Sequence, residues 1–420
     1  MTDAARQICT IGGAAALVAI HGGTPAHSLQ PNPRPPRTID MDFLITSAVV
    51  PTLRQEWGIS LTAAVWLTGS VQLGFVVGAV GSAVLNLPDR IRPHLVLAAS
   101  AAAAALCTLV FALVVSSMAG AIGLRFLTGV FLAGVYPVGI KLMASWSESS
   151  ARGRAVGILV AALTLGSALP HLISGIAGLP WRAVLLAAAG LGLLGALTAL
   201  ALVRPGPYLS ASAPTRYPQY AVTMFRERGP RLTNLGYFGH MWELYALWTW
   251  LPAFLLAAPS GSGLPASAEI TMFLAMGVAG VIGCLLGGWG ADRFGRPPTA
   301  VAALAVSGLC CVLSPLAFHA GPTVLFVFCA IWGAAVIADS GVFSTLLSEV
   351  ADIRFVGTAL TAQTAIGFGL TTVSIQLVPV LAETVGWQYS FLLLAPGPAL
   401  GALAMSAISR RPAAATTGAT

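Results

Sequence analysis

The sequence is very poor in charged residues for its length. Only 8% of the 420 residues are Asp, Glu, Lys or Arg, whereas 57% are hydrophobic. A soluble globular domain carries roughly 25% charged residues, so this chain has too few to cover a surface that faces water. The composition therefore excludes an ordinary soluble protein and favours lipid as the solvent for most of the chain.

The sequence also lacks the motifs of enzyme chemistry. It has no phosphate-cradling glycine loop, no nucleophile elbow and no residues with the spacing of metal ligands. Five of the six cysteines lie inside apolar runs, which favours small core residues over a metal or disulfide framework. We therefore expect no enzymatic activity, no cofactor, no metal site and no ATP-driven mechanism.

Long apolar runs are what the sequence has in abundance. About 20 apolar residues cross a bilayer as a helix, and eleven runs reach that length: 61–86, 94–116, 118–142, 155–177, 181–203, 233–258, 267–290, 299–319, 322–346, 356–381 and 387–409. They predict an all-α polytopic membrane protein, in which the 46 glycines and 27 prolines are tolerated.

A twelfth span, the first in the chain, is atypical. Four prolines within residues 31–36 prevent a helix there, so this span can begin only near residue 38 and ends near residue 57. We expect residues 1–37 to be irregular. Two alternatives are a cleaved signal peptide, which the arginine distribution contradicts, and a wrong or damaged start of the gene.

The arginines give the chain an orientation. Fourteen of the 20 arginines lie in one alternating set of connections and the C-terminal tail, whereas the opposite set has only Arg54 and Arg182. By the positive-inside rule, the arginine-rich set and both termini are cytoplasmic. The net charge of +7 is thus an orientation signal in a bacterial cytoplasmic membrane and not a nucleic-acid-binding patch.

The two halves of the chain repeat. Asp89 follows the second span and Asp292 the eighth, an offset of 292 − 89 = 203. Arg154 and Arg354 open the fifth and eleventh spans, an offset of 200, and Pro51 and Pro252 give 201. We predict an N-terminal six-helix bundle at 38–203, a cytoplasmic linker at 204–232, a C-terminal six-helix bundle at 233–409 and a tail at 410–420. In such duplicated transporters the substrate site lies between the halves.

Three motifs resemble the major facilitator superfamily. The run from Gly287 to Arg296 is similar to the family's Gly-x-x-x-Asp-Arg-x-Gly-Arg loop, and Leu87 to Arg92 is a degenerate copy without the glycines. Arg125 and Gly129 match the family's Arg-x-x-x-Gly motif in the fourth span. The resemblance covers residues 38–409 and is closest to bacterial members of undefined substrate. It implies two rocking halves and, often, proton coupling.

The two Asp-Arg loops are candidates for gating. Asp292 can cap the N-terminus of a neighbouring helix, and the arginines beside it can hold the other half by ion pairs. The candidate gating residues are Asp89, Arg90, Asp292, Arg293 and Arg296. A solvated turn that only sets orientation is the alternative, and it has more weight for Asp89. Lys141, near the same membrane face, is expected to extend to the surface.

Ionisable residues inside the apolar runs are candidates for the transport pathway, because charge in a bilayer is costly. Arg125 either binds an anionic group of the substrate or pairs with a carboxylate. Asp339 in the tenth span is either a proton carrier or a helix cap. Gln363 in the eleventh span either binds substrate or bridges helices.

The seventh span carries the richest polar face. His240 and Glu243 are spaced i, i+3 and can exchange a proton. With Trp248 they suggest a ligand cleft, although tryptophans can equally form an interfacial belt. An offset of 201 aligns Asp42 of the first span with Glu243, which is compatible with two carboxylates facing one cleft.

The sequence as a whole predicts a secondary active transporter that moves a small solute by alternating access. An organic anion is one candidate solute, and protons are the expected coupling ion. Its expected partners are the substrate and the lipid bilayer, and the chain is expected to be a monomer. The alternatives are a drug or metabolite efflux antiporter, a non-transporting membrane sensor and an inactive paralogue.

Overall fold

The computed structural model describes residues 7, 10, 61–176, 181–209 and 219–409. Throughout these ranges every regular element is helical. The expected first span, at 38–57, and Asp42 lie outside the described residues.

The first half of the described chain forms five long transmembrane elements. They are α3 (Leu61–Leu85), α5 (Pro93–Val114), the broken pair α6 (Met118–Leu132) and α7 (Tyr136–Ser145), α8 (Arg152–Ile176) and α9 (Trp181–Leu202). The short α4 (Leu87–Arg90) and the 3-10 turn η2 (Ser149–Ala151) lie between them. Prolines stand in the first turns of α4, α5 and α7, where a missing N–H costs nothing.

The second half follows two short turns, α10 (Tyr220–Thr223) and η3 (Met224–Arg226). It contains α11 (Arg228–Ala257), η4 (Gly261–Gly263), α12 (Ala268–Met272), the π-helical turn η5 (Phe273–Val278), α13 (Ala279–Phe294), α14 (Arg296–Phe318), α15 (Pro322–Ala338), α16 (Ser340–Val350), η6 (Ile353–Phe355), α17 (Val356–Val385), α18 (Trp387–Ser390), η7 (Phe391–Leu394) and α19 (Pro396–Ser409). α11 therefore begins inside the range predicted as the linker.

The helices coincide with the eleven apolar runs. Nine helical stretches within the described ranges are long and apolar enough to cross a membrane, and Gly69–Leu85 of α3 is a shorter apolar helix. The eleventh run corresponds to α11. The predicted all-α polytopic fold is confirmed, and the twelfth span stays a prediction.

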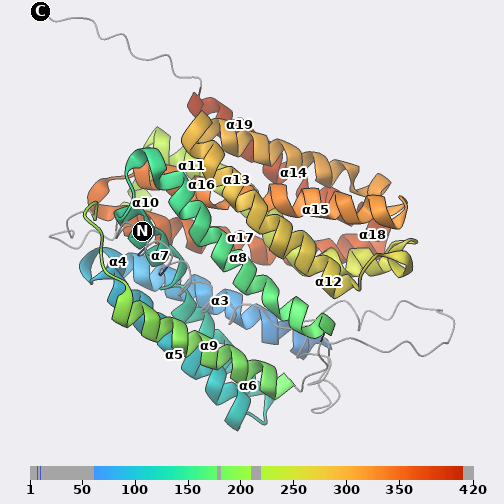
Figure 1. Ribbon diagram of the computed structural model, residues 1–420, viewed down its shortest axis with the longest axis horizontal. Helices are drawn as coiled ribbons and strands as arrows, with labels where there is room; N and C mark the ends of the chain where they lie inside the picture. The colour runs from blue at the N-terminus through green and yellow to red at the C-terminus, as the bar shows by residue number, and fades with distance from the viewer. Residues whose placement is uncertain (1–6, 8–9, 11–60, 177–180, 210–218, 410–420) are drawn as a thin grey trace, which may run out of the picture.

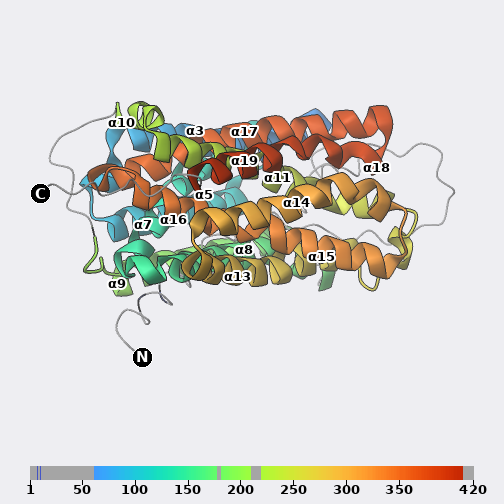
Figure 2. The ribbon, with the colours of Figure 1, turned by 90° about the horizontal axis from the view of Figure 1, so that it is seen from above.

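The long helices run roughly along one axis and turn back at the two ends of the molecule (Figures 1 and 2). Within the halves, α3 packs against α6, α5 against α9, and α11 against α17 and α19. The two most extensive contacts between the halves are those of α8 with α13 and of α3 with α17. Any site between the halves is therefore bounded by these two pairs.

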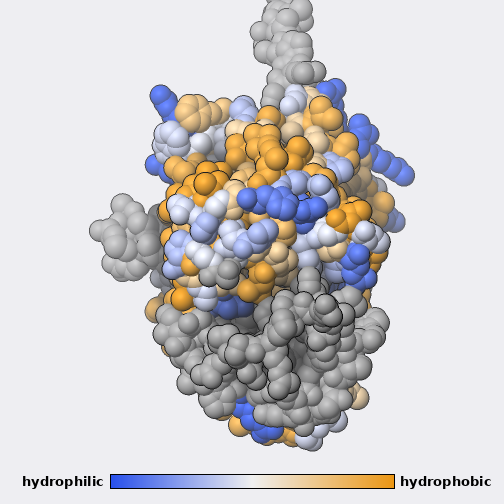
Figure 3. All heavy atoms as spheres, turned by 90° about the vertical axis from the view of Figure 1, so that its right-hand side faces the viewer, coloured by the Kyte–Doolittle hydropathy of each residue, from blue (hydrophilic) through white to orange (hydrophobic). Residues whose placement is uncertain are grey.

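The sides of the bundle expose large apolar residues, as a lipid-facing surface requires. Leu197, Leu286 and Leu403 are 62%, 59% and 68% exposed. Figure 3 views the end that carries α12 and α18, where hydrophilic residues are interspersed with hydrophobic ones. Glu383 and His319 are exposed or partly exposed near this end of the helices.

Candidate functional site

Two transmembrane elements are broken in the middle. α6 ends at Leu132 and α7 restarts at Tyr136, with Pro137 in its first turn. α15 ends at Ala338 and α16 restarts at Ser340, with Asp339 between them. The restarts are equivalent in the two halves, because 340 − 136 = 204, within one residue of the offset of 203 that relates the two Asp-Arg loops. Discontinuous helices leave polar groups at mid-membrane, where transporters place their sites.

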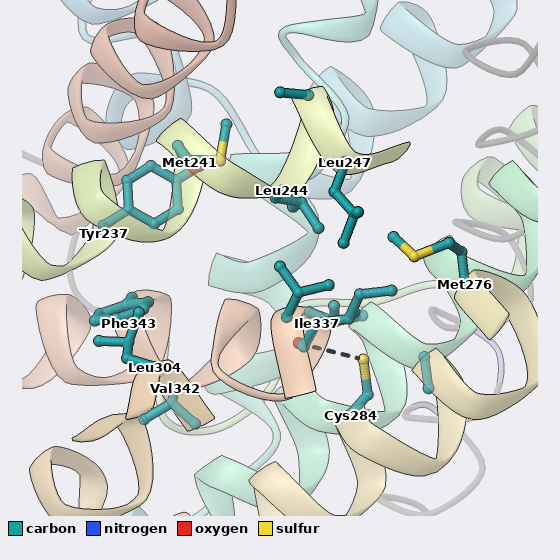
Figure 4. Close-up of a cluster of buried hydrophobic side chains, with 14 of the residues drawn as sticks. Tyr237, Met241, Leu244, Leu247, Met276, Cys284, Leu304, Ile337, Val342 and Phe343 are labelled. Atoms are coloured by element: carbon teal, nitrogen blue, oxygen red, sulfur yellow. Dashed lines mark hydrogen bonds between the residues drawn. The ribbon is translucent and has the colours of Figure 1, made fainter. Parts of the chain in front are cut away.

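The two broken elements meet between the halves. The Tyr136 hydroxyl lies 3.4 Å from the Ser344 hydroxyl, and either oxygen can donate the hydrogen bond. Apolar residues surround the second break: Figure 4 shows Ile337 and Val342 on its two sides, with Tyr237 and Leu244 of α11 packed opposite. The Tyr237 ring meets the Phe343 ring edge-on at 6.2 Å between centroids.

An aromatic layer also crosses the interface between the halves. Phe75 of α3 stacks on Phe368 of α17, with 4.1 Å between ring centroids. Tyr245 of α11 adds a third ring, 4.9 Å from Phe368. We call Phe75, Phe368 and Tyr245 the aromatic layer. Sequence reasoning missed it, because Phe75 and Phe368 each sit alone in an apolar run.

Arg125 lies on α6, the helix that packs against α3, which carries Phe75 of this layer. It is one helical turn before Gly129, and a Cβ added to Gly129 would lie 2.8 Å from the backbone nitrogen of Phe75. The side chain is buried, and within the described ranges no carboxylate lies within ion-pair distance of it. A buried guanidinium in this position can bind a carboxylate in bidentate geometry.

The polar face of the seventh span divides between two different contacts. His240 Nδ1 lies 2.9 Å from Asp339 Oδ1, and its Nε2 lies 3.0 Å from the Ser340 hydroxyl. All three residues are buried. His240 thus contacts the break between α15 and α16, and the structure brings together two of the predicted pathway residues, His240 and Asp339.

Glu243 points elsewhere, into the interior of the second half. Its carboxylate accepts hydrogen bonds from Trp332 Nε1 at 2.6 Å, the Ser307 hydroxyl at 2.9 Å and Cys311 Sγ at 3.3 Å. These donors come from α14 and α15. The expected exchange of a proton between Glu243 and His240 therefore has no direct contact to support it, since each has its own partners.

The other predicted pathway residues have simpler surroundings. Gln363 is buried on α17, and its Nε2 has no hydrogen-bond partner among the described residues. Trp248 is partly buried against the core of the second half. Within the described ranges no group of three or more metal-ligating side chains is present, and the described cysteines are free thiols.

The first Asp-Arg loop joins the two halves through a buried carboxylate. Asp89 Oδ1 accepts a hydrogen bond from Gly357 N at 3.0 Å, and Oδ2 accepts from Thr358 N and Oγ1, both at 2.7 Å. Gly357 and Thr358 lie in the first turn of α17, so Asp89 caps a helix of the other half. We call Asp89, Lys141, Gly357 and Thr358 the Asp89 clamp.

Lys141 is where the sequence-based expectation was wrong. Its Nζ donates to Asp89 Oδ1 at 2.5 Å and to the Pro88 carbonyl at 2.9 Å, and its side chain is 8% exposed. The ammonium does not extend to the membrane surface, because it pairs with the Asp89 carboxylate and the Pro88 carbonyl of α4. Asp89 is also no solvated turn, since its side chain is only 1% exposed.

The second Asp-Arg loop makes the matching contact in the opposite direction. Asp292 Oδ1 accepts from Gly153 N at 2.8 Å, and Oδ2 accepts from Arg154 N at 2.9 Å and from its Nε at 3.2 Å. Gly153 and Arg154 open α8, so here too a carboxylate caps a helix of the other half. Asp292, Arg154, Gly153 and Arg296 form the Asp292 clamp.

Arg296 ties this clamp to further groups. Its Nη2 donates to the Ser149 carbonyl at 2.5 Å and to Glu349 Oε1 at 2.9 Å, and lies 3.6 Å from Asp292 Oδ1. Arg90 and Arg293, the other two predicted gating residues, are exposed. The side chains of these two do not enter the clamps.

A third contact joins the halves at the end opposite the clamps. His171 Nδ1 on α8 lies 2.8 Å from Glu269 Oε2 on α12, and both side chains are largely buried. Sequence reasoning missed this pair, since both residues lie at the edges of apolar runs. The α8–α13 side of the interface is therefore tied at one end by the Asp292 clamp and at the other by His171 and Glu269.

Three relatives are similar to this chain in sequence. A gallate transporter of Pseudomonas putida is 28% identical, over 64% of this chain and 66% of its own length. A 4-hydroxybenzoate transporter of Pseudomonas aeruginosa is 27% identical, over 60% of this chain and 64% of its own. The chain thus spans slightly less than two thirds of each of these two relatives. A gentisate transporter of Corynebacterium glutamicum is 24% identical over 88% of this chain and 84% of its own.

Solved structures show the same fold. The fucose:proton symporter of E. coli matches with a TM-score of 0.70 at 13% identity, over 98% of this chain and all of the symporter chain. A human organic anion transporter matches with a TM-score of 0.72 at 14% identity, over 96% of this chain and all of the transporter chain. The model of the Major Facilitator Superfamily matches residues 38–375. The chain therefore belongs to the major facilitator superfamily.

Proposed function

We propose that this protein moves an aromatic carboxylate anion across the bacterial cytoplasmic membrane by alternating access. The observation that carries the proposal is the aromatic layer between the halves, together with the buried Arg125 on α6, the helix that packs against the α3 helix of Phe75. Aromatic rings pack favourably against other rings, and a guanidinium binds a carboxylate in two parallel hydrogen bonds. A benzoate-like anion combines the two groups that these side chains recognise.

The names of the relatives support this substrate class. Gallate, 4-hydroxybenzoate and gentisate each have a benzene ring, a carboxylate and at least one hydroxyl group. In this chain the Tyr136 and Ser344 hydroxyls, 3.4 Å apart, are available to bind a ring hydroxyl. The proposed assignments are the layer for the ring, Arg125 for the carboxylate and the hydroxyl pair for the ring hydroxyl.

Alternating access would require the contacts between the halves to open in turn. The two clamps close one end, which the arginine distribution assigns to the cytoplasm, with both termini on that side. His171 and Glu269 hold the other end. If the clamps separate while the His171–Glu269 contact persists, the cytoplasmic end would open. If the His171–Glu269 contact separates while the clamps persist, the outer end would open. We infer that one monomer suffices, because both halves are in one chain.

Proton coupling is proposed through the His240–Asp339 pair. A buried carboxylate next to an imidazole can pass between a neutral and a charged pair when one proton is gained or lost. Asp339 lies at the break between α15 and α16, five residues before Ser344 of α16. A proton gained there would alter the charge beside the proposed substrate site.

The substrate proposal is tested by uptake into proteoliposomes of a panel that separates ring from carboxylate. 4-Hydroxybenzoate should be transported. Cyclohexanecarboxylate has a saturated ring instead of an aromatic one, and phenol lacks the carboxylate, so both should compete poorly. Arg125→Gln should abolish uptake, and the exposed Arg226→Gln serves as the matched control. Equal competition by all three compounds, or full uptake by Arg125→Gln, would reject the assignment.

Coupling is tested in the same vesicles. Uptake should rise with an imposed pH gradient, and Asp339→Asn should retain counterflow exchange while losing the response to the gradient. Uptake that is independent of the gradient in the unmodified protein would reject proton coupling and leave the substrate proposal intact.

A further inference from the structure

An apolar groove lies on the outside of the first half, between α5 and α9, which run side by side. It has a volume of about 350 Å³. Its walls are Leu95, Ala98, Ala99, Ala102, Leu193, Ala196, Leu197 and Leu200. The small side chains of the alanines on successive turns of α5 leave space between the two helices. The leucines of α9 form the exposed edge of the groove. The groove follows α5 for about 10 Å, since seven residues rise 1.5 Å each.

The groove ends at a cationic rim. Arg92 precedes α5 directly, and Arg204 stands just beyond the end of α9, so both lie at the clamp end of the molecule. Both side chains are exposed, and both act electrostatically on the His94 imidazole. Across the described residues no carboxylate lies within ion-pair distance of either arginine.

His94 adds a second, independent observation. Its side chain is more than nine-tenths buried, yet its Nδ1 has no hydrogen-bond partner among the described residues. His94 and Ala98 are spaced i, i+4, so the imidazole lies on the same face of α5 as the groove wall. A polar atom without a partner, within electrostatic range of two guanidinium groups, favours an anionic group at this position.

We propose that the groove binds an anionic phospholipid. One acyl chain lies over Ala98, Ala99 and Ala102, and the phosphate contacts Arg92 and Arg204 beside His94. Because the apolar groove is continuous with the cationic rim, we favour a lipid over a free phosphate ion. A free phosphate ion would make no contact with the alanine wall. The site lies on the outer face of α5 and α9, away from the interface between the halves, and is independent of the proposed transport function.

Native mass spectrometry of the purified full chain tests this proposal. The probes are dioleoyl phosphatidylglycerol, dioleoyl phosphatidylcholine with the same acyl chains, and glycerol phosphate without acyl chains. We expect selective retention of phosphatidylglycerol. Retention should fall roughly fivefold for each of Arg92→Gln and Arg204→Gln, because each basic group near an anionic surface contributes about that factor.

A second variant separates the groove from the rim. Ala99 is exposed, so Ala99→Trp should fill the groove and displace the lipid while both arginines remain. Ala187→Trp, at an exposed position of α9 outside the groove, is the matched control. Thermal unfolding in phosphatidylcholine, unchanged from the unmodified protein, shows that each variant is folded.

Four outcomes would overturn the proposal. They are equal retention of the two lipids, equal retention of glycerol phosphate, unchanged retention in Ala99→Trp, and loss in Ala187→Trp equal to that in Ala99→Trp. A photoreactive residue at position 197 that crosslinks to residues 8–20 of the chain, and not to lipid, would also overturn it. Crosslinking to phosphatidylglycerol supports it.

Discussion

The Asp89 and Asp292 clamps share one geometry but differ in what surrounds the carboxylate. Each carboxylate caps the first turn of a helix from the other half through two backbone N–H groups. The Asp89 clamp pairs two largely buried side chains, 1% and 8% exposed, whereas Arg154 beside Asp292 is 59% exposed. The ion pair of the Asp89 clamp is therefore buried on both sides, whereas the ion pair of the Asp292 clamp has a cation that is exposed to solvent.

The difference also concerns which half supplies the cation. Lys141 belongs to the same half as Asp89, so this ion pair can persist when the α17 end separates. Arg154 belongs to the half opposite Asp292, and that pair would break in the proposed opening of this end. Arg296, 3.6 Å from Asp292 and on its own side, can then neutralise the carboxylate. In the proposed alternating-access cycle, each clamp would thus keep one cation beside its aspartate.

The largest expected effect is that of Lys141→Met. The substitution leaves Asp89 buried without its counter-ion, and breaking a buried pair in this way costs about 3–5 kcal/mol. We expect a large fall in the unfolding temperature of the purified protein. The double variant Lys141→Met with Asp89→Asn should recover part of that loss, and a single variant as stable as the unmodified protein would show that the pair is not buried.

Gly153→Ala and Gly357→Ala should each open one clamp. An added Cβ would lie 2.5 Å from Asp292 Oδ1 in the first and 2.6 Å from Asp89 Oδ1 in the second. Overpacking of this kind costs about 1–3 kcal/mol. Thiol labelling of a single cysteine placed at the clamp end should rise in both variants. Gly81→Ala, where nothing lies within 4 Å of the added Cβ, is the control.

Arg154→Gln should have a smaller effect. An exposed ion pair contributes about 0.2–1 kcal/mol and is screened by salt. The fall in unfolding temperature should shrink further in 1 M salt, whereas the effect of Lys141→Met should not change. Equal salt sensitivity of the two variants would remove the contrast between a buried and an exposed clamp.

The smallest effect is expected from Asp352, which lies beside the clamps but caps no helix of the other half. The hydrogen bond from Arg354 lowers the pKa of the Asp352 carboxyl below its usual value. A lowered folded-state pKa contributes stability above the unfolded value of about 3.9, and that stability is lost as the pH falls further. Unfolding temperatures of Asp352→Asn and the unmodified protein should therefore converge below about pH 4.

The fold followed from the sequence because the physical signal was strong. Runs of about 20 apolar residues have few alternatives to a membrane helix, and the helices end within a few residues of those runs. The offset near 203 related the Asp-Arg loops correctly. The Arg154–Arg354 match, at an offset of 200, is one helical turn away from the clamp residues, since 357 − 153 = 204. Residues one helical turn apart lie on the same face of a helix, so an alignment of the two halves that is shifted by one turn still matches similar residues.

The site was less accessible to sequence reasoning, because partners are set by packing between distant helices. His240 and Glu243 share a face in sequence, yet one contacts Asp339 and the other Trp332. The breaks near Tyr136 and Asp339 were missed inside continuous apolar runs, although Pro137 and Gly341 stand beside them. Lys141 was expected to extend to the membrane surface because it lies close to that surface in sequence. Distance along the sequence is a poor measure of depth in a span that is broken in the middle.

The stack of Phe75 on Phe368 has a consequence for affinity. At 4.1 Å between centroids, the rings leave no space for a third ring between them, so an aromatic ligand inserted there must separate them. Such a ligand would bind the clamped form more weakly than a form with the rings apart. By linkage, its dissociation constant would become a measure of the population of the clamped form. Variants that loosen a clamp should then bind the ligand more tightly, even though the clamps lie at the end of the molecule.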